Sequence, residues 1–194
     1  MPATKHAQEI KNDSKEYLTT ALFQILKNKS LEEIKITELV KRAGVSRMAF
    51  YRNYNTLEEI LIAYFEPKIA TLFEAVILQI PSSQKMEELQ FFFSEFSTAL
   101  SLAIKRNYEY IIQGIFHRHM LLFYAKNTDW RCIPPMQLNY WSQFMSAGVY
   151  AIWREWFLNR QGESLEEIHE LIATFQNATM QALLKEDHKK ECDS

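Results

Sequence analysis

Several features common in other protein classes are scarce in this chain of 194 residues. Only four Gly and five Pro are present, which leaves little material for turns and favours long helices. No sustained alternation of apolar and polar residues and no βαβ rhythm is found, so sheet-based folds are not indicated. The two cysteines, Cys132 and Cys192, are far apart in the sequence and are expected to be free thiols of a reducing cytoplasm.

Long hydrophobic runs are also missing. No stretch of about 20 apolar residues occurs, and the start of the chain, Met1 to His6, is polar and carries no signal-peptide core. We therefore expect a cytoplasmic protein with no membrane partner. Apolar residues make up 47% and charged residues 24% of the chain, which is typical of a globular protein with a sizeable core. The expected fold class is all-α.

Residue patterns that carry catalysis are absent too. There is no Gly-rich phosphate loop and no nucleophile elbow. His117 and His119 are two positions apart, so on a helix they point to different faces and are poorly placed to bind one metal ion. Asp129 and Cys132 have no recognised metal-ligand spacing. We expect no enzyme, no metal and no cofactor.

What the chain does contain is a segment of two short helices joined by a tight turn, from Ile36 to Tyr54. Thr37 is expected to be the N-cap of the first helix and Gly44 its C-cap, where a left-handed backbone costs glycine little. Ser46 is expected to cap the second helix after only one intervening residue. This layout is that of a helix-turn-helix, whose second helix enters the DNA major groove.

The side chains of the second helix divide between two faces. Ala49 and Phe50 are expected to face inward. The outward positions are left to Arg47, Met48, Tyr51 and Arg52. Arginine can bind guanine edges or phosphates, and tyrosine hydroxyls can bind phosphate oxygens. An ordinary helix–helix turn in an all-α protein is the alternative that the turn alone leaves open.

The residues around the turn resemble the tetracycline-repressor (TetR) family of transcriptional regulators over about residues 12–65. The resemblance rests on an amphipathic opening helix with Leu18, Ala21, Leu22, Ile25 and Leu26, on the segments 34–37, 43–46 and 49–54, and on the helix start 56–61. It implies a three-helix DNA-binding domain at residues 10–66, with its motif at about 35–54, and a helical effector-binding and dimerisation domain at 67–186. The expected DNA-binding residues are Lys35, Thr37, Ser46, Arg47, Met48, Tyr51, Arg52, Asn53 and Tyr54.

Four positions depart from the family's usual pattern. Met48 replaces a small residue and adds bulk beside the bases, which changes the surface that reads them. Leu57 replaces a lysine that meets a backbone phosphate, so Lys35 or Arg52 is left to supply that contact. Asn53 and Tyr54 replace a common His and Phe, and they keep the polar or aromatic character of those positions.

Charge is unevenly distributed along the chain. Residues 1–56 contain ten Lys and Arg against six Asp and Glu, a net charge of +4. Since the whole chain carries −2, residues 57–194 carry −6. A cationic end on an acidic body fits docking to phosphates through that end, although chance can also produce a difference of a few charges.

The rest of the chain is expected to be helical. The capping box of Thr56 and Glu59 opens a helix that should kink or break near Glu66, because Pro67 removes a backbone hydrogen bond. Further helices are expected at 86–104, at 108–124 with a break near Gly114, at 137–159, and from the cap Ser164 to about 184.

Two functions are expected of this body. The resemblance implies that the last two helices pair with those of a second copy, through Ala147, Gly148, Ala151, Ile168, Ile172, Phe175 and Thr179. It also makes a pocket for an unknown small-molecule effector plausible, with candidate residues Phe92, Phe96, Tyr108, Phe116, Tyr140, Trp141 and Phe144. In both sets, burial in the core of a single chain is the alternative.

The sequence thus predicts a homodimeric repressor that binds a palindromic double-stranded DNA operator and is released by an effector. The alternative is a helical co-regulator or adaptor that binds a protein partner through the same fold. Sequence-dependent DNA binding that weakens steeply with salt distinguishes the two.

Overall fold

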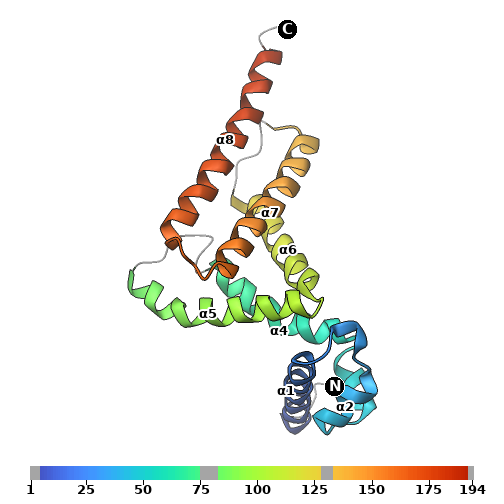
Figure 1. Cartoon of the computed structure of the whole chain (residues 1–194). Coiled ribbons are helices and arrows are strands. Elements are labelled where there is room, and N and C mark those ends of the chain that lie inside the picture. Colours follow the sequence, from blue (N-terminus) through green and yellow to red (C-terminus); the bar gives the residue numbers. More distant parts are fainter. Residues whose placement is uncertain (1–4, 75–82, 128–132, 192–194) are drawn as a thin grey trace. The chain divides into compact units, whose positions relative to one another are not determined.

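The computed structural model describes residues 5–74, 83–127 and 133–191, with side chains described at 13–74, 90, 92–126 and 133–184. All regular structure within these ranges is helical, which confirms the all-α fold class (Figure 1). The elements are α1 (Lys5–Leu26), the short 3-10 helix η1 (Leu31–Glu33), α2 (Ile36–Ala43), α3 (Arg47–Asn53), α4 (Leu57–Leu72), α5 (Ser83–Lys105), α6 (Glu109–Asn127), α7 (Pro135–Leu158) and α8 (Leu165–Glu191).

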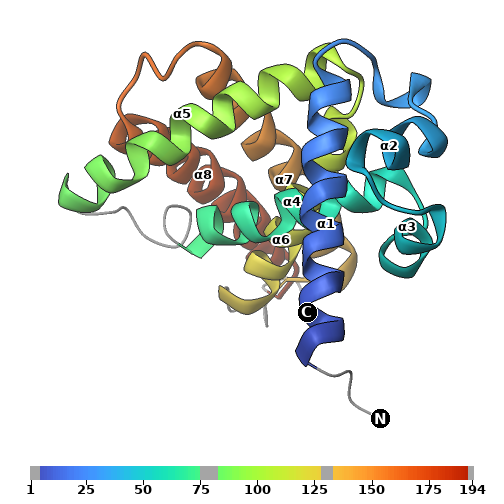
Figure 2. The same ribbon diagram turned by 90° about the horizontal axis from the view of Figure 1, so that it is seen from below.

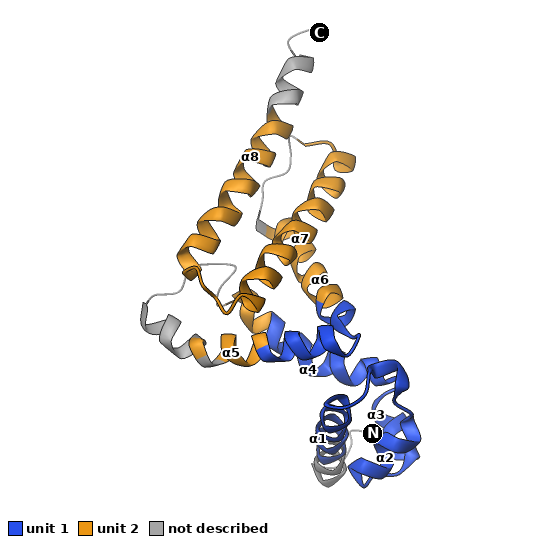
Figure 3. Cartoon of the chain, viewed as in Figure 1, with its two compact units in different colours: residues 1–69, 98–112 blue, residues 70–97, 113–194 orange. Residues whose placement is uncertain are grey.

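The chain forms two compact units (Figure 3). The first contains residues 1–69 and 98–112, and the second contains residues 70–97 and 113–194. In the first unit α1, α2 and α3 pack against one another in pairs (Figure 2). Their core includes the predicted stripe of α1, which is buried as expected at Leu18, Ala21, Leu22, Ile25 and Leu26.

Residues 98–112 join the first unit through the turn between α5 and α6. The Leu31 N–H donates to the Arg106 carbonyl at 3.1 Å, and the Arg106 guanidinium donates to the Lys27 carbonyl. Tyr108 is fully buried, and its ring lies 6.4 Å from that of Phe65. The turn therefore packs on the loop that leads into α2, although it is distant from that loop in the sequence.

Only some helices of the first unit begin at a residue whose polar side chain caps them. Ser30 and Glu33 form a capping box at η1. At α2, by contrast, Lys35 is the N-cap without a side-chain hydrogen bond, so the prediction that Thr37 caps this helix is wrong. The Glu38 and Leu39 N–H groups donate to the Lys35 carbonyl, which places Thr37 inside the first turn.

Two predicted helix breaks do not occur. Helix α4 continues through Pro67, and α6 continues through Gly114. On α4, Phe65, Ile69 and Leu72 are at most 1% exposed, so burial along one face holds the helix together across the proline. None of the described helices is long and apolar enough to cross a lipid bilayer.

In the second unit α7 and α8 pack side by side (Figure 1). The predicted capping box at the start of α8 is present: the Ser164 N–H donates to the Glu167 carboxylate at 2.7 Å, and the Glu167 N–H donates to Ser164 Oγ at 3.2 Å. Between the helices, Trp141 Nε1 donates to Thr179 Oγ1 at 3.0 Å. Both cysteines lie outside the described residues.

Candidate nucleic-acid interface

The turn between α2 and α3 is closed by backbone hydrogen bonds and one side-chain cap. Gly44 has a φ of +67°, the left-handed conformation expected of it, and its N–H is shared between the Lys41 and Val40 carbonyls. Ser46 accepts from the Ala49 N–H at 3.0 Å, which confirms it as the N-cap of α3. This geometry fixes the direction of α3 with only three residues, Gly44 to Ser46, between the helices.

Helix α3 is anchored by one side chain and exposes four others. Phe50 is fully buried and touches the rings of Tyr51 and Tyr54, at centroid distances of 5.1 and 6.4 Å. The exposed side chains are those predicted from the sequence, Arg47, Met48, Tyr51 and Arg52. Arg47 and Arg52 make no side-chain hydrogen bond or ion pair with described residues, so both guanidinium groups are available to a partner.

The last two predicted DNA-binding residues do not share this exposed face. Tyr54 is only 6% exposed, Lys15 Nζ lies 5.9 Å from its ring centroid, and burial raises the pKa of its phenol despite a hydrogen bond with Thr19. Asn53 donates its amide to the Ala49 carbonyl at 2.8 Å, and its Oδ1 is buried. These contacts hold the end of α3, so neither residue belongs to the candidate interface.

A second cationic surface lies along α2. Lys35, Thr37, Glu38, Lys41 and Arg42 line an open hollow of about 580 Å³. Lys35 and Thr37 were predicted, whereas Lys41 and Arg42 were missed, although both lie opposite the apolar positions of α2. The hollow thus adds exposed cations beside the first unit's α3.

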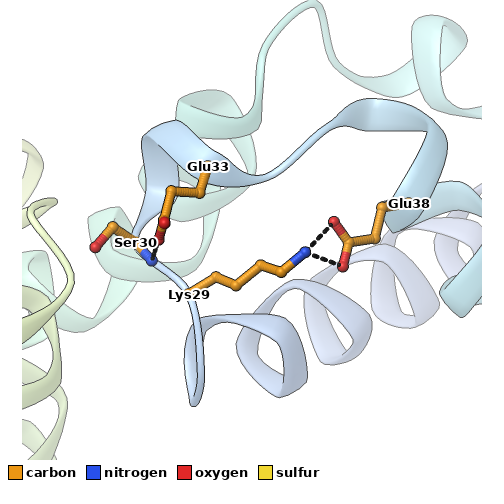
Figure 4. A network of polar contacts seen from close by, with 4 residues as sticks. All are labelled: Lys29, Ser30, Glu33 and Glu38. Carbon is orange, nitrogen blue, oxygen red and sulfur yellow. Dashed lines mark hydrogen bonds and ion pairs between the residues drawn. The ribbon is translucent and has the colours of Figure 1, made fainter.

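The one acidic side chain of this hollow is paired. Lys29 Nζ lies 2.8 Å from Glu38 Oε1 and 2.9 Å from Oε2 (Figure 4). The neighbouring Glu33 carboxylate accepts from the Ser30 N–H at 2.7 Å (Figure 4). Because Lys29 offsets the charge of Glu38, the cations at the hollow keep a net positive field toward an approaching phosphate.

Leu57 is buried at 9% exposure, so this position contributes to the core of the first unit. Lys35 and Lys41 are exposed and make no side-chain hydrogen bond or ion pair with described residues. Lys35 thus retains the free ammonium expected of a phosphate contact that Leu57 cannot make.

A scan against models of protein families finds no match, and a search of curated proteins finds none either.

The seven aromatic residues predicted for an effector pocket have different surroundings in the structure. Tyr108 belongs to the first unit, and Tyr140 and Phe144 are 68% and 65% exposed on α7. The others pack as separate ring pairs: Phe92 with Phe96 at 5.9 Å, Phe116 with Tyr150 at 5.4 Å, and Trp141 with Tyr124 at 4.9 Å. The ring pairs of Phe92, Phe96, Phe116 and Trp141 are typical of aromatic core, whereas Phe144 lines a hollow of the second unit, so an effector pocket at this set stays a prediction.

A smaller hollow of about 170 Å³ is present elsewhere in the second unit. Its lining comes from α6, α7 and α8 and includes Met120, Phe123, Trp153, His169 and Gln176. Burial lowers the pKa of His169, which keeps the imidazole neutral near pH 7. No pattern in the sequence singled out these residues.

The residues predicted for a dimer interface differ in how exposed they are. Ala147, Gly148, Ala151 and Phe175 are exposed. Ile168 and Ile172 are 6% and 9% exposed, and Thr179 is half-buried beneath Trp141. Ile168 is therefore core of the single chain, whereas Ile172 and Thr179 still line an open apolar hollow.

That apolar hollow has a volume of about 350 Å³ and lies between α7 and α8. It is lined by Phe144, Met145, Gly148, Val149, Ile152, Ile172, Phe175 and Thr179. An added Cβ at Gly148 would meet no atom within 4 Å, so this face is open. Exposed apolar side chains continue from it along α7, at Met136 and Tyr140.

A metal centre has no support among the described residues, which hold no group of three His, Cys, Asp or Glu side chains able to bind one ion. His117 Nδ1 instead lies 2.7 Å from Ser146 Oγ, where it links α6 to α7.

Proposed function

We propose that this protein is a DNA-binding transcriptional regulator of the TetR type, a repressor that binds a palindromic operator as a homodimer. The observation that carries the proposal is the outer face of α3. Arg47 and Arg52 are exposed there without partners among the described residues, beside Met48 and Tyr51, on a helix whose direction is set by the Gly44 turn and the Ser46 cap. Guanidinium groups on a short projecting helix suit base edges and phosphates in a major groove.

The cations of α2 have a complementary role in this proposal. Lys35 and Lys41 would contact backbone phosphates and set the register of the protein on the duplex, while α3 reads the bases. Such contacts release counterions, so the affinity should fall steeply with salt.

Homodimerisation is proposed through the open face of α7 and α8. Phe144 and Phe175 are 65% and 49% exposed at the rim of an apolar hollow, which is unfavourable unless another surface covers them. The small side chains around Gly148 allow a second helix to approach closely. Two copies related by a two-fold axis would present two α3 helices to half-sites one helical turn, ~34–36 Å, apart or a multiple of it.

The proposal also includes release of the DNA by a small-molecule effector, which the family resemblance implies. An effector bound in the second unit would favour a spacing of the two α3 helices that does not match the operator. A thermal-shift screen tests this point: a ligand that raises the melting temperature should also release bound DNA. Hits that stabilise the protein and leave DNA bound would contradict effector control.

The main test is selection of bound DNA from a random pool with the full-length protein. We expect a two-fold symmetric consensus, bound with an affinity that falls with salt concentration. A pool without enrichment would contradict the proposal and favour the adaptor alternative.

Arg47→Ala tests the interface itself. Loss of a guanidinium contact to a base edge should weaken operator binding about 10-fold or more, because such contacts contribute ~1–3 kcal/mol of discrimination. Lys126→Ala is the matched control, since it removes an exposed cation of the second unit and should change the affinity less than about twofold. Equal losses in the two variants would mean that only the net charge matters.

A further inference from the structure

Met48 has the most exposed large apolar side chain of the described residues, at 72%. It contributes nothing to the core of the first unit, where α3 is anchored by Phe50. Of the other large apolar side chains described, the three that are more than 60% exposed, Met136, Tyr140 and Phe144, lie on α7. Met48 instead lies on a short helix with Arg47, Tyr51 and Arg52 as its exposed neighbours, all of which carry polar groups.

The position of Met48 on α3 limits what it can touch. It is the second residue of the helix, and the N-terminal residues of a recognition helix are those that contact base edges. Tyr51 and Arg52 follow three and four positions later, so they are its neighbours on the helix surface. If Met48 contacts a base, Tyr51 and Arg52 can therefore contact the bases or phosphates next to it.

The apolar character of the Met48 side chain indicates which group of the DNA major groove it can contact. Arg47, Tyr51 and Arg52 can all donate hydrogen bonds, whereas the thioether of Met48 donates none and accepts weakly. Among the groups that base pairs present in the major groove, the C5-methyl of thymine is the apolar one. An unbranched side chain with three rotatable bonds can also adapt to the position of that methyl group.

We propose that Met48 recognises the C5-methyl group of one thymine in each operator half-site. The inference rests on the proposed function and adds a base preference to it. The contact buries one methyl group, which corresponds to about a fourfold gain in affinity for thymine over the same base without its methyl.

The test replaces thymine by deoxyuridine, one position at a time, in one half-site of the selected operator. This change removes the methyl group and keeps every hydrogen bond. We expect one position at which the wild-type protein binds about fourfold more weakly, and all other positions to change by less than about 1.5-fold. Equal binding at all positions would overturn the inference.

Two substitutions assign the methyl contact to Met48. Met48→Ala shortens the side chain and should abolish the difference between thymine and deoxyuridine, while Met48→Leu keeps an apolar side chain and should retain it. Arg47→Ala is the matched control: it should weaken binding to both duplexes and leave their ratio near fourfold. Because Met48 is exposed, its variants should keep the helix content of the wild type, which circular dichroism checks.

The outcomes separate this inference from the proposed function. If Met48→Ala retains the fourfold ratio, another side chain reads the methyl group and the inference is wrong, while DNA binding stands. If the selection returns no DNA at all, the proposed function and the inference fail together.

Discussion

At the scale of single residues, the start of a helix depends on where its first carbonyl can be placed, and a suitable side chain is only one contribution. Ser46 and Thr37 both offer a hydroxyl just before an apolar pattern. Ser46 accepts from the Ala49 N–H, whereas Thr37 lies one residue inside α2. Lys35 begins α2 through its backbone alone, and buried Ile34 and Leu39 on either side hold it there.

The difference between these hydroxyls can be measured. Ser46→Ala removes a hydrogen bond that caps α3 and should lower the free energy of unfolding by about 1 kcal/mol. Thr37→Ala removes an exposed hydroxyl that makes no cap and should change it by less than about 0.5 kcal/mol. Urea unfolding followed by circular dichroism compares the two variants. Equal losses would show that Thr37 also caps its helix in solution.

At the scale of elements, burial decides whether a helix continues past an unfavourable residue. Pro67 costs a helix interior ~3 kcal/mol. Phe65, Ile69 and Leu72 around it are almost fully buried, and each such side chain contributes about 1.5–3 kcal/mol. Their sum exceeds the cost of the proline, so α4 continues. In the same way α6 continues through Gly114, with Ile115 and Phe116 buried beside it.

Two glycines provide a test at this scale with opposite expected signs. Gly114→Ala should raise the free energy of unfolding by about 0.5–1 kcal/mol, because the residue is inside α6 and a Cβ there meets no atom within 4 Å. Gly44→Ala should lower it by ~1–2 kcal/mol, since a φ of +67° is strained for alanine even where space is open. Thermal melts of both variants measure the shifts. Changes of the same sign would contradict this assignment.

At the scale of the whole molecule, the proposed activities lie in different compact units. The candidate DNA interface belongs to the first unit, and the open face of α7 and α8 belongs to the second. Three helices, α4, α5 and α6, contribute residues to both units. In the proposed mechanism these continuous helices are the route by which effector binding in one unit would affect the other.

The oligomeric state is predicted at this scale. Gly148→Trp should convert a dimer into monomers, because a large ring would occupy the space that the second copy needs, while its Cβ meets no atom within 4 Å of its own chain. Gly114→Trp is the matched control: it places the same ring at the other open helical glycine of the second unit and should leave the dimer intact. Sedimentation equilibrium measures both. An unchanged dissociation constant for Gly148→Trp would place the interface elsewhere.

Much of the fold and part of the candidate site could be predicted from patterns of neighbouring residues. The apolar stripe of α1, the turn at Gly44 and the cap at Ser46 are all readable from neighbouring residues. The exposure of Arg47 and Arg52 also follows from helical spacing. Tyr54 could not be placed in this way, because its burial depends on packing beside Lys15 and Thr19, which are distant in the sequence.

The sequence by itself determined the all-α class, the cationic N-terminal part, and the spacing that directs the exposed side chains of α3. These depend on helical periodicity, capping and charge, which act over a few residues. Only the tertiary structure decided that Phe92 and Phe96 pack as a ring pair, that Glu38 is paired with Lys29, and that residues 98–112 join the first unit. Such features arise from contacts between distant segments, where burial outweighs the local preferences of Pro67 and Gly114.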